Sequence, residues 1–166
     1  MTTILGIDPG TATTGFGVVR LDKKQLLRFV DCGVIQTPKA KPAPERLLLL
    51  SRGFSRLLSA HRPAVVVVER IFFFKNAKTA LPVSEARGVL LLSLAKKQIR
   101  VVELTPLQAK MAITGYGRAE KRQVQRMVKE ILHLRDIPKP DDAADALALA
   151  IAGSVQMSFA NLRFPI

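Results

Sequence analysis

Four consecutive valines, Val65–Val68, constrain the fold of this chain more than any other segment. Such a run is typical of a strand that is covered on both faces, because each of its side chains needs an apolar neighbour. A sheet containing this strand must therefore lie between layers of helices. The segment Ile4–Ile7, near the amino end, is a second short apolar stretch of this kind.

The remaining segments fit an α/β arrangement around a mixed five-stranded sheet flanked by helices. Near the amino end, short turn-forming pieces separate three expected strands, which predicts an antiparallel meander. Further along the chain, strands alternate with helices. We expect strands at 4–7, 15–20, 27–36, 65–69 and 100–104, and helices at 45–60, from after 75 to about 97, at 108–113, 120–132 and 141–157.

Two of the expected helices have distinctive features. Pro82 falls in the second helix, so either that helix kinks or its regular part begins at Leu81–Pro82. The helix at 120–132 is amphipathic, with an apolar stripe opposite a polar face. The stripe contains Val124, Met127, Val128 and Ile131, and the polar face contains Lys121, Arg122, Gln125, Arg126 and Lys129.

The charge of the chain indicates what kind of partner it binds. Its 26 Lys and Arg residues against 13 Asp and Glu give a net charge of +13 over 166 residues. A single domain this basic, which we take to span residues 1–166, is expected to bind a polyanion, and nucleic acid is the commonest one. An anionic membrane surface is the weaker interpretation.

Compartment and membrane contact can also be judged from the sequence. No apolar run is long enough to span a bilayer, and the amino end does not resemble a signal peptide. The single cysteine, Cys32, excludes an intrachain disulfide framework and is expected to be a small core residue. We therefore expect a cytoplasmic protein with no membrane partner.

Acidic residues follow the two apolar strands and open the last helix. Asp8 ends the first strand and Glu69 ends the valine strand, where open α/β sheets form their ligand crevices. Asp142 and Asp145 stand three residues apart in a helix of Ala, Leu and Ile, and so lie on one face. Asp141, beside them, is expected to be the N-cap.

Four clustered carboxylates are costly to bury without cations. Oxygen ligands without a Cys or His cluster favour a hard ion, so we expect two Mg²⁺ ions, with Mn²⁺ able to substitute. Two such ions beside a phosphate would hold the attacking and leaving oxygens of an in-line displacement. We therefore predict that Asp8, Glu69, Asp142 and Asp145 are both the metal ligands and the catalytic residues.

Several short motifs occur in a fixed order along the chain, and the ordered set resembles the bacterial RuvC-type Holliday junction resolvases. The resemblance covers nearly the whole sequence. The matching segments are Gly6–Gly10, Thr14–Gly17, Val68–Glu69, Phe72, Lys75–Asn76, Ala86–Gly88, Gln108–Lys110, Gly115–Lys121 and Asp142–Ala148.

This resemblance implies a ribonuclease H-like fold and a homodimer that binds four-way DNA junctions. Members of the family nick two strands symmetrically and leave 5′-phosphate and 3′-hydroxyl ends, in DNA recombination and repair. The family's four metal-binding acids correspond to the four carboxylates above. The family also suggests a branch-migration helicase complex as a further partner, although no residue of the chain shows it.

The resemblance assigns DNA contacts as well. Lys110 and Lys121 correspond to family lysines near the scissile phosphate, although lysines at such positions are often only solvated. Phe72 corresponds to the aromatic that stacks on unpaired bases, and Phe73 and Phe74 leave open which ring does so. The basic residues around the acids include Lys75, Arg118 and Arg122, which we also expect to contact DNA.

Three other functions remain open from the sequence. One is a nuclease of the same fold that acts on an RNA–DNA hybrid. A second is a fragment of an actin-like ATPase or sugar kinase, since Gly6–Thr11 is similar to a phosphate-binding hairpin, although 166 residues leave no room for a second large domain. A third is a junction-binding protein without catalytic activity.

Overall fold

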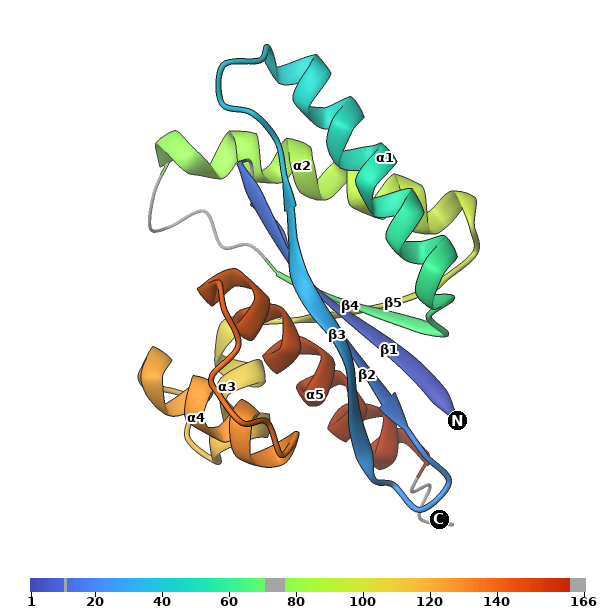
Figure 1. Ribbon diagram of the computed structural model, residues 1–166, viewed down its shortest axis with the longest axis vertical. Coiled ribbons are helices and arrows are strands. Elements are labelled where there is room, and N and C mark those ends of the chain that lie inside the picture. The colour runs from blue at the N-terminus through green and yellow to red at the C-terminus, as the bar shows by residue number, and fades with distance from the viewer. Residues whose placement is uncertain (11, 71–76, 162–166) are drawn as a thin grey trace.

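The computed structural model describes residues 1–10, 12–70 and 77–161, and for 77–79 and 158–161 it describes the backbone alone. Five strands form one mixed sheet in the order β3-β2-β1-β4-β5 (Figure 1). The first three strands are antiparallel neighbours, whereas β4 runs parallel to β1, and β5 runs parallel to β4. The strands are β1 (Thr2–Asp8), β2 (Thr13–Leu21), β3 (Leu27–Gln36), β4 (Val65–Glu69) and β5 (Arg100–Leu104).

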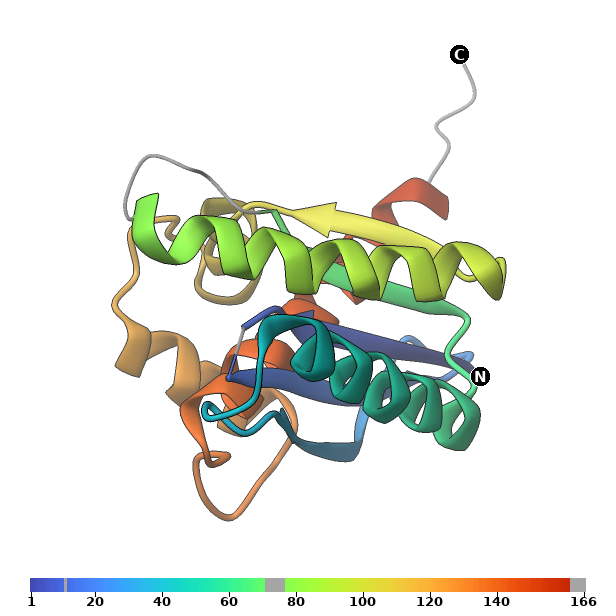
Figure 2. The same cartoon turned by 90° about the horizontal axis from the view of Figure 1, so that it is seen from above.

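Helices cover both faces of this sheet, as the valine run predicted. α1 and α2 lie side by side on one face (Figure 2), and α3, α4 and α5 lie on the other (Figure 1). The helices are α1 (Ala43–His61), α2 (Ala77–Lys96), α3 (Pro106–Thr114), α4 (Lys121–Ile131) and α5 (Asp141–Asn161). The predicted mixed five-stranded sheet flanked by helices is confirmed.

Two apolar cores follow from the alternation of side chains along the strands. Within the valine run, Val66 and Val68 pack with α1 and α2, while Val65 and Val67 pack with α3, α4 and α5. All four valines are buried. The valine run is therefore buried on both faces, because alternate valines pack into different cores.

Helix α5 lies unusually close to the sheet, and glycines make this approach possible. A Cβ added to Gly6 would lie 2.0 Å from the backbone oxygen of Ala146, and one added to Gly15 would lie 2.1 Å from that of Asp142. Gly15 is the β2 partner of Asp8 in the antiparallel register. The glycines therefore bring the first turn of α5 next to the end of β1.

Details of three helices differ from the sequence expectation. α2 begins at Ala77 and includes Pro82, so its regular part does not begin at that proline. On α4, Met127 is 37% exposed whereas Gln125 is buried, so the division of that helix into two faces was wrong at these two positions. The side chain of Asp141, expected to cap α5, bonds to α4 instead.

Two further expectations concern the rest of the chain. Cys32 is half-buried against the core that contains α5, which agrees with its expected structural position. Among the helices that the structure describes, none combines the length and apolar character needed to cross a bilayer.

Candidate active site

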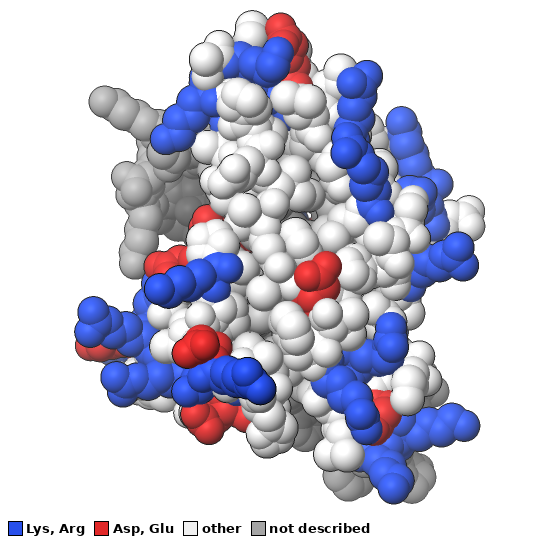
Figure 3. All heavy atoms as spheres, in the orientation of Figure 1, with Lys and Arg blue, Asp and Glu red and all other residues white. Residues whose placement is uncertain are grey.

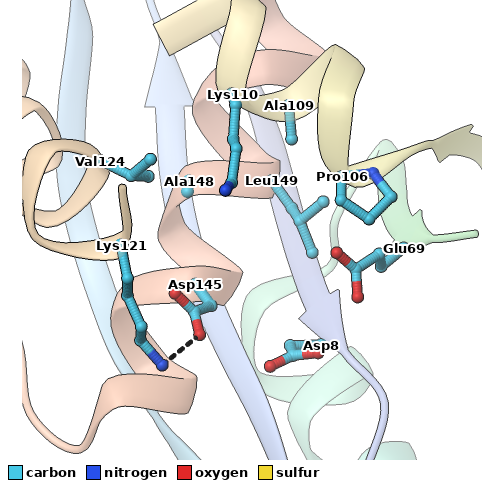
Figure 4. A pocket seen from close by; sticks show the side chains of 10 residues that line it. All are labelled: Asp8, Glu69, Pro106, Ala109, Lys110, Lys121, Val124, Asp145, Ala148 and Leu149. Carbon is cyan, nitrogen blue, oxygen red and sulfur yellow. Dashed lines mark ion pairs between the residues drawn. The ribbon is translucent and has the colours of Figure 1, made fainter. Parts of the chain in front are cut away.

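A cavity of about 230 Å³ opens where β1 and β4 end, below α3, α4 and the start of α5 (Figure 4). Asp8, Glu69 and Asp145 contribute carboxylates to its wall, and Lys110 and Lys121 contribute ammonium groups. The rest of the lining is Pro106, Ala109, Val124, Ala148 and Leu149. Three of the four predicted carboxylates and two of the predicted DNA-contacting lysines therefore share one cavity.

The sheet register places the first two carboxylates. β1 and β4 are parallel neighbours in which Ile7 pairs with Val68, and Asp8 and Glu69 are the residues that follow in each strand. Because parallel strands end at the same edge, both acids reach that edge together. Asp145 comes from the second turn of α5, which the close contact with β1 holds beside them.

The crowding of acids changes their protonation. Burial, followed by repulsion from Glu69, Asp145 and Asp142, raises the pKa of Asp8 to about 7. Burial and then Asp145 raise the pKa of Glu69, against the opposing effect of Lys110. The pKa of Asp145 is raised mainly by burial, and Lys121 opposes this shift. The cavity therefore favours a positive charge beside these carboxylates.

Asp142 lies next to this group rather than on the cavity wall. Its backbone packs over Gly15, and its charge reaches Asp8. Across residues 1–10, 12–70 and 77–161, no three carboxylate, imidazole or thiol side chains are gathered closely enough to hold a single metal ion. The four acids are thus neighbours, but their side chains do not converge on one point.

The two lysines are held by contacts on different sides of the cavity. Lys121, in the first turn of α4, places its Nζ atom 2.9 Å from Oδ2 of Asp145 and 3.2 Å from Oδ2 of Asp141 (Figure 4 shows the Asp145 pair). Lys110 donates from Nζ to the backbone oxygen of Ala119 at 2.6 Å. Lys121 is therefore paired with a cavity carboxylate, whereas Lys110 is held by the backbone and acts on Glu69 through its charge.

The other predicted DNA contacts lie outside the cavity. Arg118 and Arg122 are exposed, near the start of α4. Figure 3 shows Lys and Arg side chains interspersed with acids in this part of the surface. Phe72 and Lys75, with Phe73 and Phe74, lie outside the described residues.

Three contacts near the site were missed from the sequence. Gln125 and Asp141 form a hydrogen bond between α4 and α5. Glu103 on β5 accepts a hydrogen bond from Arg87 on α2 and pairs with Arg70, which follows Glu69. Only one sequence signal could have indicated the hydrogen bond between Gln125 and Asp141. Each helix carries two polar residues four positions apart, Lys121 and Gln125 on α4 and Asp141 and Asp145 on α5.

Comparison with known proteins agrees with this geometry. The family model described as crossover junction endodeoxyribonuclease RuvC matches residues 4–153. A relative of that name from Rubrobacter xylanophilus is 54% identical over 160 residues, which cover 95% of this chain and 89% of the relative.

Solved structures of Holliday junction resolvases are also similar to this chain. The structure described as Thermus thermophilus RuvC in complex with Holliday junction substrate is 32% identical, with a TM-score of 0.90, and covers 96% of this chain and 97% of that one. The yeast mitochondrial Holliday junction resolvase Ydc2 shares the fold, with a TM-score of 0.69 at 16% identity, over 95% of this chain and 81% of its own.

The strand order, the position of the acids and these matches place the chain in the class of ribonuclease H-like endonucleases. Within that class it belongs to the RuvC family of crossover junction endodeoxyribonucleases. The family resemblance drawn from the sequence motifs is therefore confirmed, and the ATPase or kinase alternative is excluded.

Proposed function

We propose that this protein resolves Holliday junctions by nicking two strands symmetrically at a four-way DNA junction. The observation that carries the proposal is the cavity in which Asp8, Glu69 and Asp145 meet Lys110 and Lys121, in a chain of the RuvC family. The similar Thermus protein, described in complex with a Holliday junction, supports the same substrate.

The residues of the cavity fit a divalent metal. Its acidic groups offer only oxygen, which hard ions such as Mg²⁺ prefer, and Mn²⁺ can replace Mg²⁺ at such ligands. Burial and the neighbouring acids raise the pKa of Asp8 against the opposing charge of Lys121, so a cation bound beside this carboxylate would be stabilised. We propose two ions per site, held by Asp8, Glu69, Asp142 and Asp145. When bound, they would lower the pKa of a coordinated water and offset charge on the phosphate.

The products follow from the direction of attack. Water attacks the scissile phosphorus in line, and the bond to the 3′ oxygen breaks, so that the ends are a 5′-phosphate and a 3′-hydroxyl. Lys110 and Lys121 place two positive charges where negative charge builds on the phosphate oxygens. Because Ala119 holds Lys110, that charge is in position before DNA arrives.

Paired nicks require two copies of the site related by a two-fold axis. We propose a homodimer formed through α2, because this helix exposes an apolar stripe. Leu81 and Leu92 are 68% and 56% exposed. They lie eleven residues apart, and therefore on one face of the helix, with exposed Gly88 between them.

Other DNA contacts complete the proposal. Arg118 and Arg122 would bind the phosphate backbone beside the cavity, and Phe72 and Lys75 would act at the crossover through stacking and charge. A single domain over residues 1–166, a cytoplasmic location and a branch-migration helicase complex as partner also remain proposals.

Strand-specific nicking tests the function. A synthetic four-way junction, the matching linear duplex and an RNA–DNA hybrid are incubated with the protein, with and without Mg²⁺. We expect symmetric nicks on the junction alone, and only with metal. Equal cleavage of all three substrates would remove the junction selectivity, and preferred cleavage of the hybrid would point to the alternative nuclease.

A further inference from the structure

Two pairs of polar residues face each other across α4 and α5 beside the cavity. Lys121 and Gln125 are one turn apart on α4, and Asp141 and Asp145 are one turn apart on α5. The Lys121 Nζ atom lies between the two carboxylates, 3.2 Å from Asp141 and 2.9 Å from Asp145. Nε2 of Gln125 donates to the other oxygen of Asp141 at 3.2 Å.

Only one of these two carboxylates belongs to the cavity. Asp145 lines it, whereas Asp141 lies outside its wall, with a side chain that is 67% exposed. Gln125 is only 8% exposed, so its amide is a fixed donor that orients Asp141 from the side of the core. Asp141 thus holds Lys121 from outside the cavity.

We propose that Asp141 is a positioning residue that keeps the Lys121 ammonium at the cavity when Asp145 takes another partner. The inference rests on the proposed function, in which Asp145 binds a metal ion that competes with Lys121 for its carboxylate. Asp141, which Gln125 orients, can then still form an ion pair with Lys121. Lys121 stays beside the phosphate site instead of moving into solvent.

Simple electrostatics predicts the opposite effect for this residue. An additional acid at the edge of a DNA-binding site repels phosphate, so its removal would strengthen binding and leave cleavage unchanged or faster. If Asp141 holds Lys121 in place, its removal slows cleavage even though binding is no weaker. The sign of the change in kcat therefore separates the two explanations.

The test variant is Asp141→Asn, which keeps the oxygen that accepts from Gln125 and removes the charge that holds Lys121. Its matched control is Glu130→Gln, which removes an equal charge from an exposed position at the other end of α4. For Asp141→Asn we expect junction affinity in EDTA at least equal to wild type and kcat lower by about fivefold, as for one partly exposed ion pair. Mn²⁺ binding, measured by electron paramagnetic resonance, should be unchanged.

Two more variants show whether the effect passes through Lys121. In a Lys121→Ala background, Asp141→Asn should cause no further loss of kcat, because coupled residues are not additive. Asp141→Glu should recover much of the wild-type kcat, since it restores the charge. A loss of the same size in both backgrounds, or a kcat for Asp141→Asn equal to that of Glu130→Gln, would overturn the proposal. Weaker Mn²⁺ binding would also overturn it, because Asp141 would then be a metal ligand.

A final measurement does not depend on cleavage. Acetic anhydride labelling of Lys121, quantified by mass spectrometry in saturating Mn²⁺, should be several-fold faster in Asp141→Asn than in wild type or Glu130→Gln. Equal labelling rates would refute the positioning role even if the protein cut no junction. Absence of nicking by wild type and Glu130→Gln together would instead refute the proposed function.

Discussion

Asp8→Asn should stabilise the metal-free protein while removing its cleavage activity. The pKa of Asp8 is raised from 3.8 to about 7 by burial and by three neighbouring acids. Between about pH 4 and pH 7 the folded protein therefore holds a proton that the unfolded chain has released. Stability consequently falls as pH rises through this window, and ionised Asp8 is unfavourable above it.

The size of the effect follows from the pKa difference. A shift of this size corresponds to at most about 4 kcal/mol, at 1.36 kcal/mol per pKa unit. Because Asp8 is not completely buried and water screens part of the repulsion, we expect a gain of about 2–4 kcal/mol at pH 8. At pH 4 the gain should be below about 1 kcal/mol, since Asp8 is then protonated in the folded wild type.

Urea unfolding in EDTA at pH 4 and pH 8 measures this gain. Glu130→Gln, a change on the surface, should stay within about 0.5 kcal/mol of wild type at both pH values. Added Mg²⁺ should stabilise the wild type more than Asp8→Asn, because the ion binds the folded carboxylates. The explanation would be refuted if Asp8→Asn were no more stable than wild type at pH 8, or if its gain were the same at both pH values.

Three further predictions concern the fold and the dimer. Gly6→Ala should lower the free energy of unfolding by several kcal/mol, on the order of a severe core clash, because its Cβ would meet the backbone oxygen of Ala146. Gly33→Ala should cost less in the same urea experiment, because the nearest atoms belong to the movable ring of Phe16; equal losses would contradict the close approach of α5. Glu103→Gln should destabilise by about 1–3 kcal/mol, since it leaves the partly buried Arg87 without its charge partner, and an unchanged denaturation midpoint would show that the pair contributes nothing. Leu92→Glu should convert a dimer into monomers in sedimentation experiments, whereas Leu26→Glu, on a distant turn, should not; dimers in both variants would place the interface elsewhere.

The sequence was sufficient to predict the sheet because its strongest signals are local. The valine run had to be buried on both faces, and the strands at 27–36, 65–69 and 100–104 are found with those bounds. Asp8 and Glu69 were identified as site residues because an acid that ends a buried strand is costly unless it has a function. Their meeting in one cavity follows from the parallel pairing of β1 and β4.

Contacts between helices could not be predicted in this way. Gln125 was assigned to the polar face of its helix because glutamine is usually exposed, yet the packing of α4 against α5 buries it. Asp141 was expected to cap its own helix, a local role, but α4 offers it Lys121 and Gln125. In both cases a partner distant in sequence decided the outcome, and no periodicity within one helix carries that information.

The most direct test of the central claim compares cleavage and binding for the three cavity carboxylates. Asp8→Asn, Glu69→Gln and Asp145→Asn are assayed with a labelled four-way junction in Mg²⁺, and their junction affinities are measured in parallel. We expect each variant to bind the junction about as tightly as wild type or more tightly, because each loses a negative charge, and to make no detectable nicks. Nicking by any of these variants at the wild-type rate would contradict the assignment of this cavity as the active site.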